Sequence, residues 1–245
     1  MAPTNPKQIH VLITGYGGFS RIAVNPSWGI ASTFIIPQTI SLPSDGLEIV
    51  ITAHPDELRV SYPLIDALVP ELWKDRKWDY ILHIGVGLEG GYCLETQTWS
   101  EGYKLKDVDG FAPEVGEEVE MKGIHGSEQK EVAKGKGRIL KTAVDVKWVV
   151  EKVVEKVKAE EDEGEILQMK VSMDPGMYLC GYIYRASLLE AEKYEGEADK
   201  KRVCFLHVPP NGKRYGIETG CEVVKKVIEG MVRAGEDLRD GDGEL

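Results

Sequence analysis

Cys180 lies where a cysteine could act as a nucleophile. The segment at residues 171–188 (VSMDPGMYLCGYIYRASL) predicts a strand, a turn at 173–176 and then a helix with Cys180 in or near its first turn. Unpaired amide N–H groups and the helix dipole favour a thiolate at such a position. The same amides could stabilise an oxyanion once the thiolate attacks a carbonyl. A free cysteine can also be a small buried hydrophobe, which is the role we expect for Cys93, Cys204 and Cys221.

Two further side chains could complete a catalytic triad with this cysteine. His207 lies at the carboxyl end of a strand predicted over 202–208, and open α/β sheets form their sites at such ends. Glu95 follows the strand predicted over 80–85 and could orient the imidazole and stabilise its charged form. The residues alone leave plain alternatives open: a core histidine with satisfied hydrogen bonds, and a solvent-exposed loop carboxylate.

A glycine-rich turn at residues 15–20 (GYGGFS) partly matches a dinucleotide-binding loop. Ser20 takes the place of the third glycine, and the acids at 54–57 (HPDE) lie about twice as far downstream as a ribose-binding acid should. The turn could instead join a strand tightly to a helix, or present Tyr16 and Phe19 to a ligand. The five histidines are scattered, and no Cys or His pair has metal-ligand spacing, so we expect no metal and no cofactor.

Strands and helices alternate along the chain. Short, nearly continuous apolar runs, typical of strands covered on both faces, occur at 9–14, 47–53, 80–85, 166–172 and 202–208. Asn25 followed by Pro26 predicts the start of a helix. Apolar residues at helical spacing, which we expect to face the core, occur at 64–73, 146–157 and 223–232. The alternation predicts an α/β fold with three layers, α/β/α, around a mostly parallel, mixed and twisted sheet.

We expect a single domain over residues 1–234. Within it, residues 111–138 are charged and glycine-rich and predict an insertion loop, and residues 235–245 form an acidic tail. A chain of 245 residues is long enough to bury a substantial core.

Charge and composition narrow the class of protein. The formal net charge of −11 argues against a partner of nucleic acid or anionic lipid. Four cysteines are too few for a disulfide-stapled scaffold. No apolar run approaches a membrane span, and the first residues (MAPTNPKQ) do not resemble a secretory signal. We therefore expect a cytoplasmic location.

Four segments, in chain order, resemble motifs of the pyroglutamyl peptidase I family, also called pyrrolidone-carboxylate peptidases. They are VLITGYGGF with NPSW at 25–28, ILHIGVGLEGG with Glu95, GMYLC at 176–180, and FLHVP at 205–209. This family of cysteine peptidases removes an N-terminal pyroglutamyl residue from peptides. The resemblance implies that Cys180 is the nucleophile, that His207 acts as base and then acid, and that Glu95 supports the imidazole.

The resemblance also implies how the substrate is held. The pyroglutamyl group is a neutral lactam, so its site should be mainly apolar with a few placed hydrogen bonds. Tyr16, Phe19 and Tyr178 would supply aromatic walls, and the backbone carbonyl of Leu88 would accept the lactam N–H. The expected partners are peptides with a blocked N-terminus, whereas the oligomeric state stays open.

Several positions depart from the family pattern. Gly181 stands where asparagine is usual, Gly18 replaces a proline, Ser20 and Arg21 replace a glycine pair, and Thr96 replaces an arginine. These positions surround the predicted site but leave the three catalytic positions intact. Two alternatives therefore stay open: a non-catalytic protein that binds peptide ends, and a related cysteine hydrolase that takes another acyl group.

Overall fold

A seven-stranded mixed sheet lies at the centre of the computed structural model, which describes residues 5–20, 22–113, 137–160, 167–193, 202–210, 215–236 and 238. The strand order is β2-β3-β1-β4-β9-β5-β8. Strands β3, β1, β4 and β9 are mutually parallel, β2 and β5 run antiparallel to β3 and β9, and β8 is parallel to β5. The strands are β1 (Lys7–Gly15), β2 (Gln38–Leu42), β3 (Leu47–Ala53), β4 (Tyr80–Val86), β5 (Tyr92–Glu95), β8 (Met169–Ser172) and β9 (Val203–Val208).

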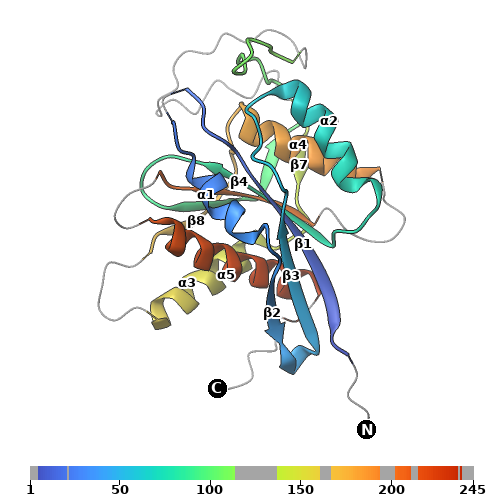
Figure 1. Cartoon of the computed structure of the whole chain (residues 1–245), viewed down its shortest axis with the longest axis vertical. Coiled ribbons are helices and arrows are strands. Elements are labelled where there is room, and N and C mark those ends of the chain that lie inside the picture. Colours follow the sequence, from blue (N-terminus) through green and yellow to red (C-terminus); the bar gives the residue numbers. More distant parts are fainter. Residues whose placement is uncertain are drawn as a thin grey trace.

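Helices cover both faces of this sheet. The helices are α1 (Pro26–Ala31), α2 (Tyr62–Lys74), α3 (Val146–Glu160), α4 (Leu179–Glu192) and α5 (Ile217–Gly235). Short 3-10 turns occupy Ser32–Phe34 and Pro43–Asp45, and a separate two-stranded sheet pairs β6 (Gln97–Trp99) with β7 (Ile139–Lys141). Figure 1 shows α2 and α4 on one side of the sheet and α1, α3 and α5 on the other. The predicted three-layer α/β/α fold of a single domain is confirmed.

The core forms where the expected apolar stripes meet the sheet. The stripe of α5, which includes Val227 and Met231, is fully buried together with Val149 of α3. On the other face, Ile65 of α2 packs with Leu188 of α4. The stripe predicted at 64–73 was wrong at one position, since Leu64 is 49% exposed while Ile65, Val69 and Leu72 make the buried face.

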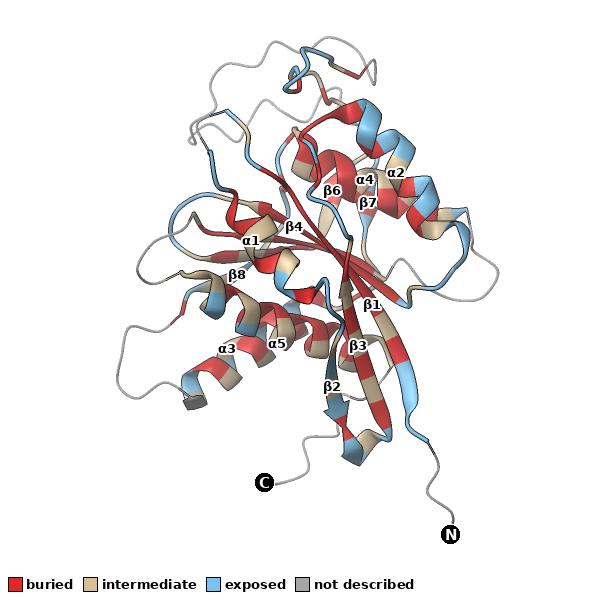
Figure 2. Cartoon of the chain, in the orientation of Figure 1, coloured by how far each residue is buried: buried red, intermediate tan, exposed pale blue. Residues whose placement is uncertain are grey.

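Only the central strands are covered on both faces. Strand β4 is buried along nearly its whole length (Figure 2). Strand β3 instead alternates buried and half-buried residues, and β8 is half-buried or exposed throughout. The expectation of two covered faces was therefore wrong for β8, because it lies at the edge of the sheet, and only partly right for β3, where every second residue is half-buried.

Four short strands, β2, β5, β6 and β7, were not predicted. Most of the predicted insertion at 111–138 and most of the tail at 235–245 lie outside the described residues, so both stay predictions, as do the bounds of the domain. None of the described helices combines the length and the apolar character needed to cross a membrane.

Candidate active site

Cys180 is the second residue of α4, as the sequence predicted. Tyr178, the residue before the helix begins, has extended backbone angles and makes no side-chain cap for the helix. The first backbone bond of this turn runs from the N–H of Tyr182 to the carbonyl of Tyr178 at 2.9 Å. The amides between them, including that of Cys180, therefore have no acceptor within the helix and can bind an anion beside the sulfur.

His207 and Glu95 meet across two neighbouring antiparallel strands. Nδ1 of His207 on β9 lies 2.8 Å from Oε1 of Glu95 on β5. Glu95 is only 1% exposed and is the last residue of β5, so the alternative of a solvent-exposed loop carboxylate was wrong. The register places Glu95 opposite Phe205, two residues before His207, so all three side chains share the sheet face under α4.

The pairing with Glu95 leaves Nε2 of His207 for Cys180, whose thiol is within hydrogen-bonding reach of the ring. Burial lowers the pKa of His207, but its hydrogen bonds and charge interactions with Cys180 and Glu95 outweigh burial and raise the pKa above its ordinary value. The arrangement therefore favours a charged imidazole between two acidic groups. It is the cysteine–histidine–acid arrangement of a nucleophilic hydrolase.

Two glycines leave the space in which sulfur and imidazole meet. A Cβ on Gly85 of β4 would lie 3.0 Å from Sγ of Cys180 and 2.7 Å from the ring of Phe205. A Cβ on Gly87 would lie 2.9 Å from Cβ of His207. Sequence reasoning did not assign these glycines a role. The spacing Gly-Val-Gly at the end of a strand was the available signal, but it gains meaning only once the site is assembled.

The three aromatic residues predicted to contact substrate lie near this site. Tyr16 is buried, and its hydroxyl donates to the carbonyl of Leu179 at 2.8 Å. The rings of Phe19 and Tyr178 are half-buried, with centroids 6.5 Å apart. Burial raises the pKa of the Tyr16 phenol, and the nearby Cys180 raises it further.

Leu88 follows β4 directly after Gly87, whose N–H donates to the carbonyl of Val208 at 2.8 Å. This bond keeps the backbone of residue 88 close to the end of β9. Leu88 is 82% exposed, and the role of its backbone carbonyl stays a prediction.

The glycine turn does not open a helix directly. Phe19 exchanges two backbone hydrogen bonds with Ile22 at 2.9 and 2.8 Å, and α1 begins only after Asn25, whose Oδ1 accepts from the N–H of Ser27. Ser20, with φ of 49°, forms part of the turn that presents Phe19. Helix α1 therefore begins several residues after the glycines in the chain, unlike in a dinucleotide loop, although Asn25 Nδ2 donates to the carbonyl of Gly17 at 3.1 Å.

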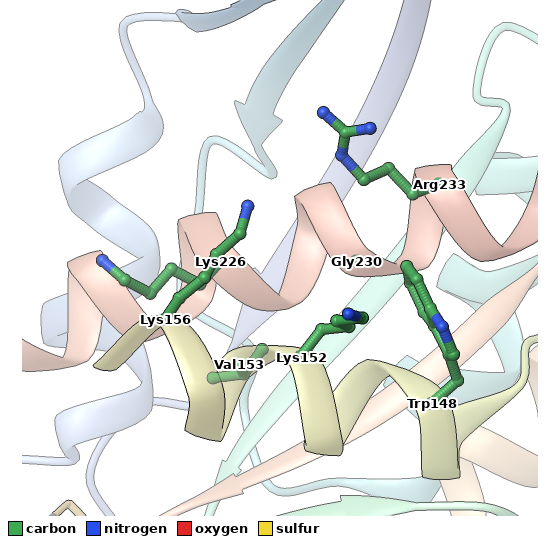
Figure 3. Close-up of a pocket in the computed structure, with 7 residues that line it drawn as sticks. All are labelled: Trp148, Lys152, Val153, Lys156, Lys226, Gly230 and Arg233. Atoms are coloured by element: carbon green, nitrogen blue, oxygen red, sulfur yellow. The ribbon is translucent and has the colours of Figure 1, made fainter. Parts of the chain in front are cut away.

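A small cavity of about 10 Å³ lies elsewhere, between α3 and α5 (Figure 3). Because these helices cover the sheet face opposite α4, the cavity is separate from Cys180. Two of the cationic side chains that line it, Lys156 and Arg233, both form ion pairs with Glu229. Its lining residues are Trp148, Lys152, Val153, Lys156, Lys226, Gly230 and Arg233. Across the part of the chain that the structure describes, no cluster of three His, Cys, Asp or Glu side chains could hold a metal ion.

Solved structures resemble this fold over nearly the whole chain. Pyrrolidone carboxyl peptidase from Pyrococcus furiosus matches with a TM-score of 0.65 and 18% identity over 92% of this chain and 99% of its own. Pyroglutamyl peptidase I from Bacillus amyloliquefaciens matches with a TM-score of 0.64 and 19% identity over 92% and 95%. At such identities the likeness concerns the fold.

Comparison of the sequence with other protein sequences gives relatives at higher identity. No protein-family model matches the chain. Pyroglutamyl-peptidase 1 of Rattus norvegicus is 30% identical over 236 residues, which cover 96% of this chain and 94% of the relative. The human enzyme of the same name is 29% identical over 223 residues, covering 91% and 89%. The chain belongs to the pyroglutamyl-peptidase 1 family.

Proposed function

We propose that this protein is a cysteine exopeptidase that removes an N-terminal pyroglutamyl residue from peptides. The observation that carries the proposal is the contact of one imidazole with two partners, the Cys180 thiol on one side and the buried Glu95 carboxylate on the other. Family membership supplies the acyl group, since the relatives are named for pyroglutamyl cleavage. The retained triad disfavours a non-catalytic binding protein.

The proposed reaction has two stages, the formation of a thioester at Cys180 and its hydrolysis. The Cys180 thiolate attacks the pyroglutamyl carbonyl carbon, and amides at the start of α4 stabilise the oxyanion. Imidazolium Nε2 of His207 gives its proton to the leaving amine, which departs as the shortened peptide and leaves a thioester. His207 then takes a proton from water, and the hydroxide attacks the thioester to release pyroglutamate and restore the thiolate. Glu95 holds the ring through Nδ1 and stabilises its charge throughout.

The substrate roles extend this proposal. Phe19 and Tyr178 would contact the faces of the lactam, with Tyr16 supporting them from the buried side. The carbonyl of Leu88 would accept the ring N–H, which specifies a lactam without requiring a charged group. Because no α-ammonium is present on this substrate, a mainly aromatic site suits it.

The decisive test is the Cys180→Ala variant with L-pyroglutamyl-7-amido-4-methylcoumarin as substrate. We expect release of the fluorophore to be abolished while the thermal unfolding midpoint stays close to that of the wild type. Cys221→Ala is the matched control, since Cys221 lies on α5 and contacts Thr33 away from the site; its turnover should be unchanged. Turnover that survives Cys180→Ala would refute the assignment of the nucleophile.

Wild-type protein without turnover would favour one of the two alternatives. A panel of coumarin amides with other blocked acyl groups then separates them. Turnover of another acyl group would identify a cysteine hydrolase of changed specificity, whereas binding without any turnover would identify a protein that only binds peptide ends.

We further propose that the protein acts in the cytoplasm. All four cysteines are free thiols in the structure, which suits a reducing compartment. The net charge of −11 disfavours nucleic acid and anionic membrane as partners, leaving peptides with a blocked N-terminus as the partner class.

A further inference from the structure

Tyr62 carries a buried hydroxyl group that the fold does not use. It is the first residue of α2, it is 0% exposed, and its hydroxyl oxygen has no hydrogen-bond partner among the described residues. Its backbone N–H donates to Oδ2 of Asp107 at 2.9 Å, which anchors the residue. Because a buried hydroxyl without a partner destabilises a fold, folding alone does not account for this group.

The ring that carries this hydroxyl lies beside a residue proposed to bind substrate, Tyr178. The ring of Tyr62 meets that of Tyr178 edge to face, with centroids 6.2 Å apart and planes at 89°. Tyr62 and Tyr178, like Cys180, lie near enough to Tyr16 to raise the pKa of its phenol, which burial raises most. Tyr62 therefore places a polar group among the aromatic side chains that surround the nucleophile.

The pyroglutamyl ring has a second polar group for which no partner has so far been proposed. The ring offers one N–H, assigned above to the carbonyl of Leu88, and one C=O, which requires a donor. The Tyr16 hydroxyl already donates to Leu179. The Tyr62 hydroxyl is available, and burial raises its pKa, so it remains a protonated donor at neutral pH.

We propose that the Tyr62 hydroxyl donates a hydrogen bond to the ring carbonyl oxygen of the pyroglutamyl group and so selects a lactam at this site. This inference rests on the proposed function. A site that pairs a buried hydroxyl with one substrate oxygen rejects rings lacking that oxygen, because the hydroxyl is then left unpaired. It makes Tyr62 a specificity-determining residue.

The test compares wild type with Tyr62→Phe, which removes one oxygen atom. Binding of two ring probes, 2-pyrrolidone and cyclopentanone, is measured by how far each protects Cys180 from alkylation by iodoacetamide, a readout that needs no turnover. Both probes carry the ring carbonyl, and only 2-pyrrolidone carries the N–H. We expect both to bind roughly tenfold more weakly to Tyr62→Phe, the loss of one buried hydrogen bond.

Tyr182→Phe is the matched control. Its ring lies 4.7 Å from that of Tyr62, but its hydroxyl donates to Asp66 of α2 at 2.8 Å, so protection by both probes should be unchanged. The thermal midpoint of Tyr62→Phe should equal or exceed that of wild type, since no bond within the fold is lost.

Three results would overturn the inference: unchanged protection by both probes, weakening confined to 2-pyrrolidone, or a lowered thermal midpoint. The second would mean that the hydroxyl pairs with the ring N–H, and the third that it has a partner in the fold. Wild-type turnover of the coumarin substrate, measured separately, tests the proposed function independently of these results.

Discussion

His83 should make the stability of this protein fall as the pH is lowered. This histidine of β4 is 0% exposed and spans two hydroxyls, with Nδ1 2.8 Å from Oγ1 of Thr14 and Nε2 2.7 Å from Oγ of Ser187. It thereby connects α4, the helix that carries Cys180, to β1. Burial lowers the pKa of His83 to about 3, because a charged imidazole would be desolvated without an opposite charge.

The direction and size of the effect follow from linkage. The unfolded chain titrates this group near its ordinary pKa of about 6.5, so below that pH the unfolded state takes up a proton that the folded state refuses. Stability is therefore complete above about pH 6.5 and is lost as the pH falls toward about 3. At about 1.4 kcal/mol per pH unit, lowering the pH from about 7 to about 5 should cost roughly 2 kcal/mol through this group.

The assay is urea unfolding of wild type and His83→Gln at both pH values. Glutamine cannot take up the proton and pairs less well with the two hydroxyls, so at about pH 7 it should lower the free energy of unfolding by about 1–3 kcal/mol. At about pH 5 this difference should shrink by roughly 2 kcal/mol. Leu82→Ala, also 0% exposed on the same strand, controls for packing and should cost the same at both pH values. A difference for His83→Gln that does not change with pH would refute the reasoning.

Two further variants test how the site is built. Glu95→Gln keeps the shape of the side chain but removes the charge facing Nδ1 of His207; we expect kcat/KM for the coumarin substrate to fall at least roughly a hundredfold with the thermal midpoint nearly unchanged, and full activity would show that the carboxylate charge is dispensable. Gly181→Ala would place a Cβ 2.1 Å from the carbonyl oxygen of Gly176; the displaced turn should lower the free energy of unfolding by about 1–3 kcal/mol in urea and reduce kcat, whereas unchanged values would mean that the turn adapts freely.

Local sequence patterns were sufficient to place Cys180 and His207, the proposed nucleophile and base, in the correct elements. Cys180 follows a strand and a turn that together predict the start of a helix, and it lies in α4. His207 lies within a nearly continuous apolar run that predicts a strand, and it lies in β9. The helix N-cap at Asn25 was equally readable. In each case the determining interactions lie within a few residues of one another.

Glu95 was harder to place from the sequence, because its position depends on pairing between distant segments of the chain. Strand β5 has four residues and runs opposite to β9, and neither its length nor its direction is visible in a periodic pattern. Glu95 becomes buried only when this register forms. Tyr62 was missed for the same reason, since its aromatic neighbours Tyr178 and Tyr182 lie at the start of α4, more than a hundred residues downstream.

Gly85 and Gly87, which lie beside Cys180 and His207, show why a site of this kind is difficult to predict from local sequence preferences. Glycine within a strand costs about 0.5–1 kcal/mol relative to alanine, yet Gly85 lies in β4, which is buried along nearly its whole length. Any side chain there would come within 3.0 Å of Sγ, and one at Gly87 within 2.9 Å of His207. Contacts across the assembled site, and not local strand preference, therefore account for glycine at these two positions. The ring of Phe205 makes the same demand at Gly85, since a Cβ there would lie 2.7 Å from it, and these contacts come from segments that are distant in the sequence.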